Sequence, residues 1–241
     1  MLLSEALAAS EKIAGWLTRE EQTLLYTLAK EVPKGKAIVE LGAWMGKSTI
    51  MLAAGSLAGS NVPVYAVDYF AVTHTVGHDY QAYLNDESKD YYTIFWENIQ
   101  RAGVSSIVHP IQCSSTKAAE KWEGPPPHLL FIDGDHRYHA VRNDFLAWLD
   151  HCRPGTRVAF HDCISSKHSG VGQFVICLSL TPLISHSVIV DSIWYGELVG
   201  TDVARIKRWL KHIPSVAAWL LTITLRITRR LFRLAHLAGT I

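Results

Sequence analysis

Two short polar motifs carry the residue types in this chain that are best suited to chemistry. Asp133 and His136 belong to an Asp-Gly-Asp-His run, and His161 and Asp162 follow each other further along the chain. Two carboxylates, completed by water and substrate, suit Mg²⁺, whereas a histidine nitrogen suits manganese, iron or zinc better. We therefore predict that Asp133, Asp162 and His161 hold a divalent cation. His136, with an ordinary pKa of about 6.5, suits a general base that activates a hydroxyl near neutral pH.

Each motif directly follows an apolar run that is typical of a buried parallel strand. Leu129 to Ile132 precedes Asp133, and Arg157 to Phe160 precedes His161. The carboxyl ends of neighbouring parallel strands meet at one edge of a sheet, where ligands bind. We expect Asp133 and Asp162 to lie together at that edge. The alternative is that the polar side chains only satisfy backbone groups in tight turns, and for His161 the two interpretations are evenly balanced.

A third stretch, AIVELGAWMGKS from position 37, predicts a short strand, a glycine turn and the start of a helix. Only three residues separate Gly42 from Gly46, which is one too few for a phosphate-binding loop. Trp44 stands where a dinucleotide-binding loop needs glycine. Glu40 beside the turn repels phosphate but suits a ligand that carries an ammonium group and hydroxyls. S-adenosylmethionine is such a ligand.

Further polar residues are expected at the ends of the next two strands. A strand from Val62 to Val67 ends in Asp68, which is placed to accept both ribose hydroxyls of a nucleoside, or else to cap a turn or helix. Ser114 and Ser115 follow a strand predicted from Val108 to Gln112. Capping the next helix is at least as good an interpretation of these serines as contact with a ligand.

These motifs together carry a resemblance. Glu40-x-Gly42-x-x-x-Gly46-x-Ser48 resembles the first motif of class I S-adenosylmethionine-dependent methyltransferases. The I-D-G-D-H run and the later F-H-D closely match one group of small-molecule O-methyltransferases, which includes macrocin O-methyltransferase and cephalosporin-hydroxylase-like proteins. The similarity extends from about residue 15 to residue 198.

The resemblance implies a Rossmann-like α/β fold, in which a mostly parallel seven-stranded sheet has helices on both faces. It implies transfer of a methyl group to a hydroxyl of a sugar or another small polar natural product, assisted by Mg²⁺ or another divalent cation. His136 is the implied base. The implied contacts to S-adenosylmethionine are Glu40, Gly42, Ala43, Trp44, Gly46, Ser48, Asp68, Ser114, Ser115 and Asp133.

Composition sets limits on partners and compartment. The 241 residues suit one large domain, expected over residues 1–200, followed by a basic helical tail over 201–241. Lys and Arg number 23 against 22 Asp and Glu, so the net charge gives no reason to expect nucleic acid. The four cysteines form no C-x-x-C pair and the first residues lack a secretory pattern, which favours a cytoplasmic protein.

The tail combines an apolar stripe with a basic stripe formed by Arg226, Arg229, Arg230 and Arg233. Its longest apolar run, Val216 to Leu221, is far shorter than the ~20 residues that span a bilayer. Such a helix could lie on the inner face of the membrane. Equally, its apolar stripe could pack on the domain or on a second subunit of a homo-oligomer.

Two other functions remain open at this point. One is a nucleotide-dependent oxidoreductase on the same sheet topology, which Trp44 disfavours. The other is a non-catalytic cofactor-binding module at a membrane surface.

Residues 69–90, a long polar and aromatic connection that includes His74 and His78, are expected to form a lid over the acceptor substrate.

Overall fold

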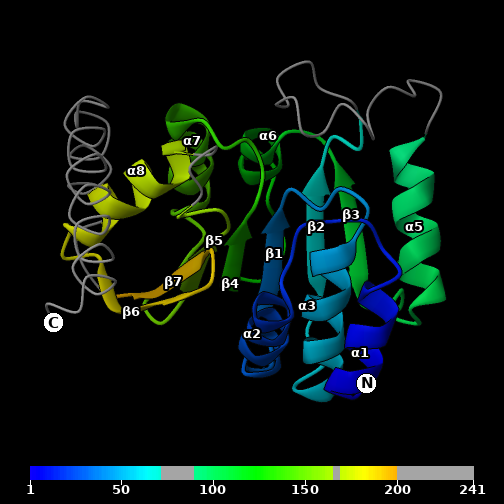
Figure 1. Ribbon diagram of the computed structural model, residues 1–241. Helices are drawn as coiled ribbons and strands as arrows, with labels where there is room; N and C mark the ends of the chain where they lie inside the picture. Colours follow the sequence, from blue (N-terminus) through cyan, green and yellow to red (C-terminus); the bar gives the residue numbers. More distant parts are fainter. Residues whose placement is uncertain (72–89, 165–168, 200–241) are drawn as a thin grey trace, which may run out of the picture.

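The computed structural model describes residues 1–71, 90–164 and 169–199 (Figure 1). The strands are β1 (Ala37–Leu41), β2 (Val64–Asp68), β3 (Val108–Gln112), β4 (Pro127–Ile132), β5 (Arg157–Phe160), β6 (Ile184–Val190) and β7 (Ile193–Leu198). The helices are α1 (Leu3–Ser10), α2 (Arg19–Lys30), α3 (Lys47–Ala58), α5 (Tyr91–Arg101), α6 (Ser115–Glu120), α7 (Tyr138–Trp148) and α8 (Ser169–Ser179).

The strands form one seven-stranded sheet in the order β3-β2-β1-β4-β5-β7-β6. Strands β1 to β5 are parallel, and β7 pairs antiparallel with both β5 and β6. The predicted Rossmann-like, mostly parallel sheet is therefore confirmed. Residues 186–198 are predicted to form a closing strand pair with one antiparallel strand at the edge, but β7 lies inside the sheet and β6, which runs in the parallel direction, forms that edge.

Helices cover both faces of the sheet. Alternate residues of β1 point in opposite directions, so Ile38 belongs to the core beneath α1, α2, α3 and α5, whereas Val39 belongs to the core beneath α6, α7 and α8. In Figure 1 the two helical layers lie on opposite sides of the strands. The central strands are thus buried on both faces, which fixes their carboxyl ends as one rigid edge.

Several boundaries differ from those that the sequence predicts. Strand β1 continues to Leu41, so Glu40 is a buried member of the strand and does not lie beside the turn. The composition of residues 4–14 predicts a helix there, but α1 ends at Ser10. A helix is also predicted over residues 141–149, and the observed α7 begins three residues earlier. The run Thr18-Arg-Glu-Glu21 predicts a capping box at the start of a helix, and the structure confirms it. The Thr18 hydroxyl accepts the Glu21 amide at 3.1 Å, and the Thr18 amide donates to the Glu21 carboxylate at 2.9 Å.

Two of the predicted regions fall outside the part of the chain that the structure describes. These are most of the expected lid, including His74 and His78, and the basic tail over residues 201–241. Within the described ranges, no helix is both long enough and apolar enough to cross a membrane.

Candidate active site

The glycine turn, residues 42–46, is pressed against the carboxyl end of β4. Gly42 has a φ of +92°, and a Cβ placed on it would lie 2.2 Å from the carbonyl oxygen of Asp133. The Asp133 amide also donates to the carbonyl of Leu41 at 2.8 Å. Gly46, at φ +91°, starts α3. Because only glycine fits these backbone positions, the turn and the first polar motif form one continuous surface.

Asp68, the last residue of β2, braces the glycine turn. Its Oδ2 accepts the amides of Ala43 and Trp44 at 2.9 and 2.8 Å, and its Oδ1 accepts the amide of Phe70 at 2.8 Å. An ionised carboxylate offers about four acceptor positions. Three are used here within the protein, which leaves one at Oδ1, and contact of Asp68 with the ribose hydroxyls stays a prediction.

Glu40 points away from the turn and toward the first residues of α3. Its Oε2 accepts the Thr49 hydroxyl at 2.5 Å, and its side chain is fully buried. Burial raises the pKa of Glu40 to about 8, and hydrogen bonds from Ser48 and Thr49 offset this only in part. In the cofactor-free protein Glu40 is therefore mainly neutral at pH 7, and Ser48 faces this carboxyl.

Three of the predicted cofactor contacts, Trp44, Ser114 and Ser115, have structural roles in the described part of the chain. Trp44, at φ +42°, stacks on Trp16 with ring centroids 5.2 Å apart and planes 14° from parallel. Ser114 caps α6, since its hydroxyl accepts the amide of Lys117 at 3.2 Å. Ser115 is the first residue of that helix. Contact of these residues with a cofactor stays a prediction.

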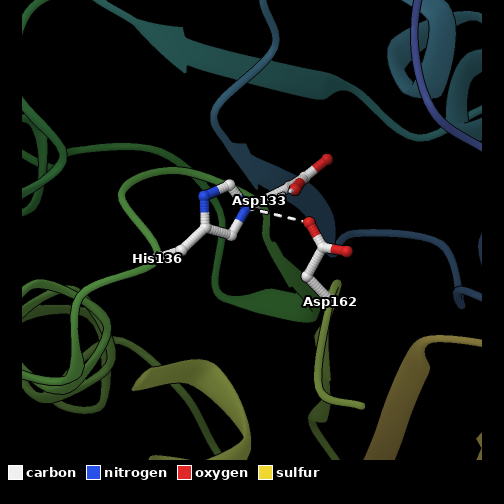
Figure 2. A group of neighbouring side chains, drawn as sticks. All are labelled: Asp133, His136 and Asp162. Atoms are coloured by element: carbon white, nitrogen blue, oxygen red, sulfur yellow. Dashed lines mark ion pairs between the residues drawn. The ribbon is translucent and has the colours of Figure 1, made fainter. Parts of the chain in front are cut away.

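Three side chains converge at the ends of β4 and β5: Asp133, His136 and Asp162, named here the Asp–His–Asp cluster (Figure 2). One possible ligand atom from each lies within 4.8 Å of the others. His136 Nε2 is 3.1 Å from Asp162 Oδ2 and 3.7 Å from Asp133 Oδ1. Asp133 and Asp162 thus lie together at one edge of the sheet, as expected from the sequence.

The backbone of Asp162 has the left-handed conformation, with φ +60°. Aspartate tolerates this conformation better than most residues, because its short polar side chain can bond locally. In a regular continuation of β5, successive side chains would point to alternate faces of the sheet. At this left-handed turn His161 Nδ1 lies 3.0 Å from Asp133 Oδ1 and 3.5 Å from Asp162 Oδ2.

Charge is strongly coupled within the cluster. Burial would lower the pKa of His136, but the carboxylates of Asp133 and Asp162 outweigh it and raise this pKa to about 9. Burial would likewise raise the pKa of Asp133, but His161 and His136 hold it well below its usual value. At neutral pH the cation-free cluster therefore holds the ionised carboxylate of Asp133 beside a protonated His136 imidazole.

His161 is in contact with the cluster but is not one of its three members. Its Nδ1 faces Asp133, and its Nε2 faces Oε2 of Glu21 at 3.5 Å. Burial would lower the pKa of His161, but the carboxylates of Asp133, Glu21 and Asp162 raise it to about 11. Both ring nitrogens thus face carboxylates, an arrangement that suits a charged structural link, and ligation of a cation by His161 stays a prediction.

Sequence reasoning missed Glu21 as a residue near the site. The only local signal for Glu21 is the capping box, which accounts for the hydrogen bond to Oε2 but does not predict a partner for Oε1. The carboxylate also accepts the amide and the hydroxyl of Ser192 at 2.9 and 2.6 Å. Contacts between residues this distant in sequence have no local pattern that could reveal them.

Comparison with known protein families gives a direct match. The family model described as "Methyltransferase domain" matches residues 39–163, which is more than half of the chain. The matched segment contains the glycine turn, Asp68 and the Asp–His–Asp cluster. The chain belongs to this methyltransferase domain family.

Sequence and structure relatives of this methyltransferase domain are distant. An uncharacterized protein, y4gI, of Sinorhizobium fredii (strain NBRC 101917 / NGR234) is 30% identical over 140 residues, which is 58% of this chain but 14% of that protein. An O-methyltransferase from Bacillus cereus, in complex with S-adenosylhomocysteine, is 20% identical with a TM-score of 0.58, covering 82% of this chain and 90% of the other.

Two further solved structures share the fold. The O-methyltransferase TomG from Streptomyces achromogenes, in complex with S-adenosylmethionine, is 17% identical with a TM-score of 0.57 over 82% of this chain and 89% of that one. The methyltransferase MycE of the mycinamycin pathway, in complex with Mg, S-adenosylhomocysteine and mycinamycin VI, is 15% identical with a TM-score of 0.53, over 82% and 54%. At these identities the similarity establishes the fold of the methyltransferase domain and not its substrate.

Proposed function

We propose that this chain is an S-adenosylmethionine-dependent O-methyltransferase that methylates a hydroxyl of a sugar or another small polar molecule with the help of a divalent cation. One observation carries the proposal: the glycine turn touches the backbone of Asp133, the residue that begins the Asp–His–Asp cluster. A sulfonium nucleoside on the turn and a hydroxyl at the cluster would then be neighbours. Membership of the methyltransferase domain family supports the same chemistry.

The donor set of the cluster fits a divalent cation. Asp133 and Asp162 each offer a carboxylate oxygen, and both are only partly exposed, with 21% of each side chain accessible. Carboxylates with open positions for water and substrate suit Mg²⁺. A bound cation would supply Lewis acidity that lowers the pKa of an acceptor hydroxyl.

His136 is the group placed to take the proton of that hydroxyl. Its Nε2 points into the cluster, and Asp162 Oδ2, 3.1 Å away, stabilises the imidazolium that results. The two aspartates that raise the pKa of His136 are the same two that would bind the cation. Sharing their charge with a cation lowers that pKa and so makes the imidazole a better base near neutral pH.

Alignment is the second task of the protein. Methyl transfer from a sulfonium is an in-line displacement, so the acceptor oxygen, the methyl carbon and the sulfur must lie on one line. Fixed placement of two reactants can contribute on the order of 7–11 kcal/mol to lowering the barrier. The rigid edge formed by β1, β4 and β5 provides such placement, because the glycine turn and the cluster are both attached directly to it.

Calorimetric titration with S-adenosylhomocysteine and, separately, with NAD tests the cofactor. We expect binding of the first and none of the second, and the opposite result would favour an oxidoreductase. His136→Ala should reduce turnover by about 10²–10⁴-fold and leave the affinity for S-adenosylhomocysteine unchanged. Absence of methyl transfer by the wild-type protein to any member of a panel of sugars and other polyols would instead favour a non-catalytic module.

We further propose contact of the basic tail with the inner face of a membrane. The support is the sequence stripe of Arg226, Arg229, Arg230 and Arg233 opposite apolar residues. Deleting residues 214–241 should abolish pelleting with vesicles that contain anionic lipid. If the deletion leaves pelleting unchanged, the tail does not bind membrane, and packing within a homo-oligomer becomes the better explanation of its apolar stripe.

A further inference from the structure

Glu21 is a buried carboxylate at which donors from distant parts of the chain meet. It lies in the first turn of α2 and is 1% exposed. Its Oε1 accepts two hydrogen bonds from Ser192, in the turn between β6 and β7, and its Oε2 accepts the amide of Thr18. The same Oε2 forms an ion pair with His161 Nε2 at 3.5 Å. Both α2 and Ser192 lie outside the segment that matches the methyltransferase family model.

His161 connects this carboxylate to the Asp–His–Asp cluster. Its imidazole is 5% exposed and packs edge-on against Phe131, with ring centroids 6.5 Å apart. At the far end of the ring, Nδ1 lies 3.0 Å from Oδ1 of Asp133. The imidazole is hydrogen-bonded at Nδ1 and ion-paired at Nε2, which together favour one ring orientation, so the position of Asp133 Oδ1 depends on where Glu21 holds the ring.

We propose that Glu21 is a positioning residue for the cation site: through His161 it fixes the carboxylate of Asp133 in the orientation that a divalent cation requires. The inference depends on the proposed function only in its assumption that the cluster binds a cation. It gives the amino-terminal helix α2 and the turn between β6 and β7 a part in forming the site, although neither contributes a side chain to the cluster.

The geometry also selects the most informative substitution. Glu21→Gln keeps the volume of the side chain but replaces one acceptor oxygen by a donor NH₂ group. Fewest hydrogen bonds are lost if the amide oxygen stays with the two donors of Ser192. The NH₂ group then faces Thr18 and His161, where the contact with Nε2–H becomes repulsive. Ser192→Ala is the matched control, because it removes one hydrogen bond from the same carboxylate and leaves its contact with His161.

The test is the affinity of the full-length chain for Mn²⁺ alone, measured by electron paramagnetic resonance without cofactor. We expect Glu21→Gln to weaken Mn²⁺ binding by about 10- to 100-fold, the range typical of residues that orient a metal ligand. Ser192→Ala should bind Mn²⁺ within twofold of the wild type. Binding of S-adenosylhomocysteine, measured on the same samples, reports the proposed cofactor site separately and should be unchanged in both variants.

A double-mutant cycle separates positioning from a general loss of stability. If Glu21 acts through His161, then Glu21→Gln combined with His161→Asn should bind Mn²⁺ no more weakly than His161→Asn alone. Additive losses, or a Glu21→Gln protein that binds Mn²⁺ as the wild type does, would overturn the inference, as would a wild-type protein that binds no Mn²⁺. Should Glu21→Gln fail to fold, Glu21→Asp, which withdraws the carboxylate by one methylene, gives the same comparison.

Discussion

Glu40 lies in β1 and Asp133 directly follows the neighbouring strand β4, yet the first acid is mainly neutral at pH 7 and the second is ionised. Burial raises the pKa of Glu40 to about 8, where its partners are the hydroxyls of Ser48 and Thr49. Burial acts in the same direction on Asp133, but His161 and His136 reverse it and keep that carboxylate ionised. Cationic neighbours, more than depth of burial, therefore decide which acid at this edge is available to hold a cation.

The largest effect is expected when Asp133 loses its charge. Asp133→Asn should weaken Mn²⁺ binding and lower methyl-transfer activity by about 100-fold or more, because a ligand oxygen is lost and both neighbouring histidines lose a partner. Asp135→Asn is the control from the same motif, since Asp135 pairs with the exposed Arg137 outside the cluster. Equal effects of Asp133→Asn and Asp135→Asn on Mn²⁺ affinity would mean that Asp133 has no special role in binding the cation.

Gly42 is the point at which the two regions touch, so enlarging it should disturb both. Gly42→Ala combines a φ of +92° with a Cβ only 2.2 Å from the Asp133 carbonyl, and should lower the free energy of unfolding by about 3 kcal/mol or more. Gly35→Ala is the control, because Gly35 has a φ of +81° but nothing within 4 Å of its Cβ position. That substitution should cost about 1–2 kcal/mol from backbone strain alone. Chemical denaturation measures both losses of unfolding free energy. Equal losses in Gly42→Ala and Gly35→Ala would contradict the close contact between residue 42 and the Asp133 carbonyl.

The charge state of Glu40 predicts a dependence of stability on pH. Its pKa is higher in the folded protein, at about 8, than the ordinary 4.5, so the folded state retains a proton that the unfolded chain releases as pH rises. Stability is therefore lost between pH 4.5 and pH 8, by about 3 kcal/mol on reaching about pH 7.

Glu40→Gln should abolish that loss in the cofactor-free protein. The difference in unfolding free energy between variant and wild type should rise in favour of the variant by about 3 kcal/mol from about pH 4.5 to pH 7. Denaturation at the two pH values measures it, and Glu20→Gln, on the exposed side of α2, serves as the control. A difference that stays constant with pH would mean that Glu40 is ionised in the folded protein, as Asp133 is.

The smallest effect is expected at Asp68, where a carboxylate supports the backbone. Asp68→Asn replaces an oxygen that accepts amides from the glycine turn or from Phe70, and should cost about 1 kcal/mol in unfolding free energy. If the remaining acceptor position on Oδ1 binds a ribose hydroxyl, affinity for S-adenosylhomocysteine should also fall about tenfold. Loss of stability with unchanged affinity would restrict Asp68 to bracing the turn.

Most of the fold could be predicted from the sequence because its signals are local. Apolar runs ending in an acid located β2 and β4, the Thr18–Glu21 pattern located the start of α2, and the glycines located the turn after β1. The place of β7 inside the sheet could not be predicted, since no local pattern specifies which strand a hairpin pairs with. Helix α8 carries no strong cap or charge signal and was not predicted.

The candidate site was predictable in composition but not in its internal roles. The positions of Asp133 and Asp162 at the ends of two neighbouring parallel strands were enough to predict that these two aspartates meet. Which histidine joins them depends on the left-handed turn at Asp162 and on Glu21, contacts that link residues far apart in the chain. For the same reason Glu40, adjacent to the turn in sequence, proved to face α3.

The backbone of Asp162 also limits how this site can change during evolution. At a residue with left-handed backbone, glycine and asparagine are the easiest replacements and histidine comes next, since most other side chains are strained there. A descendant that abandons catalysis should therefore drift to one of these few residues at position 162 and keep the turn. A duplicated copy carrying asparagine there would be recognisable from its sequence as a protein that retains the architecture without the reaction.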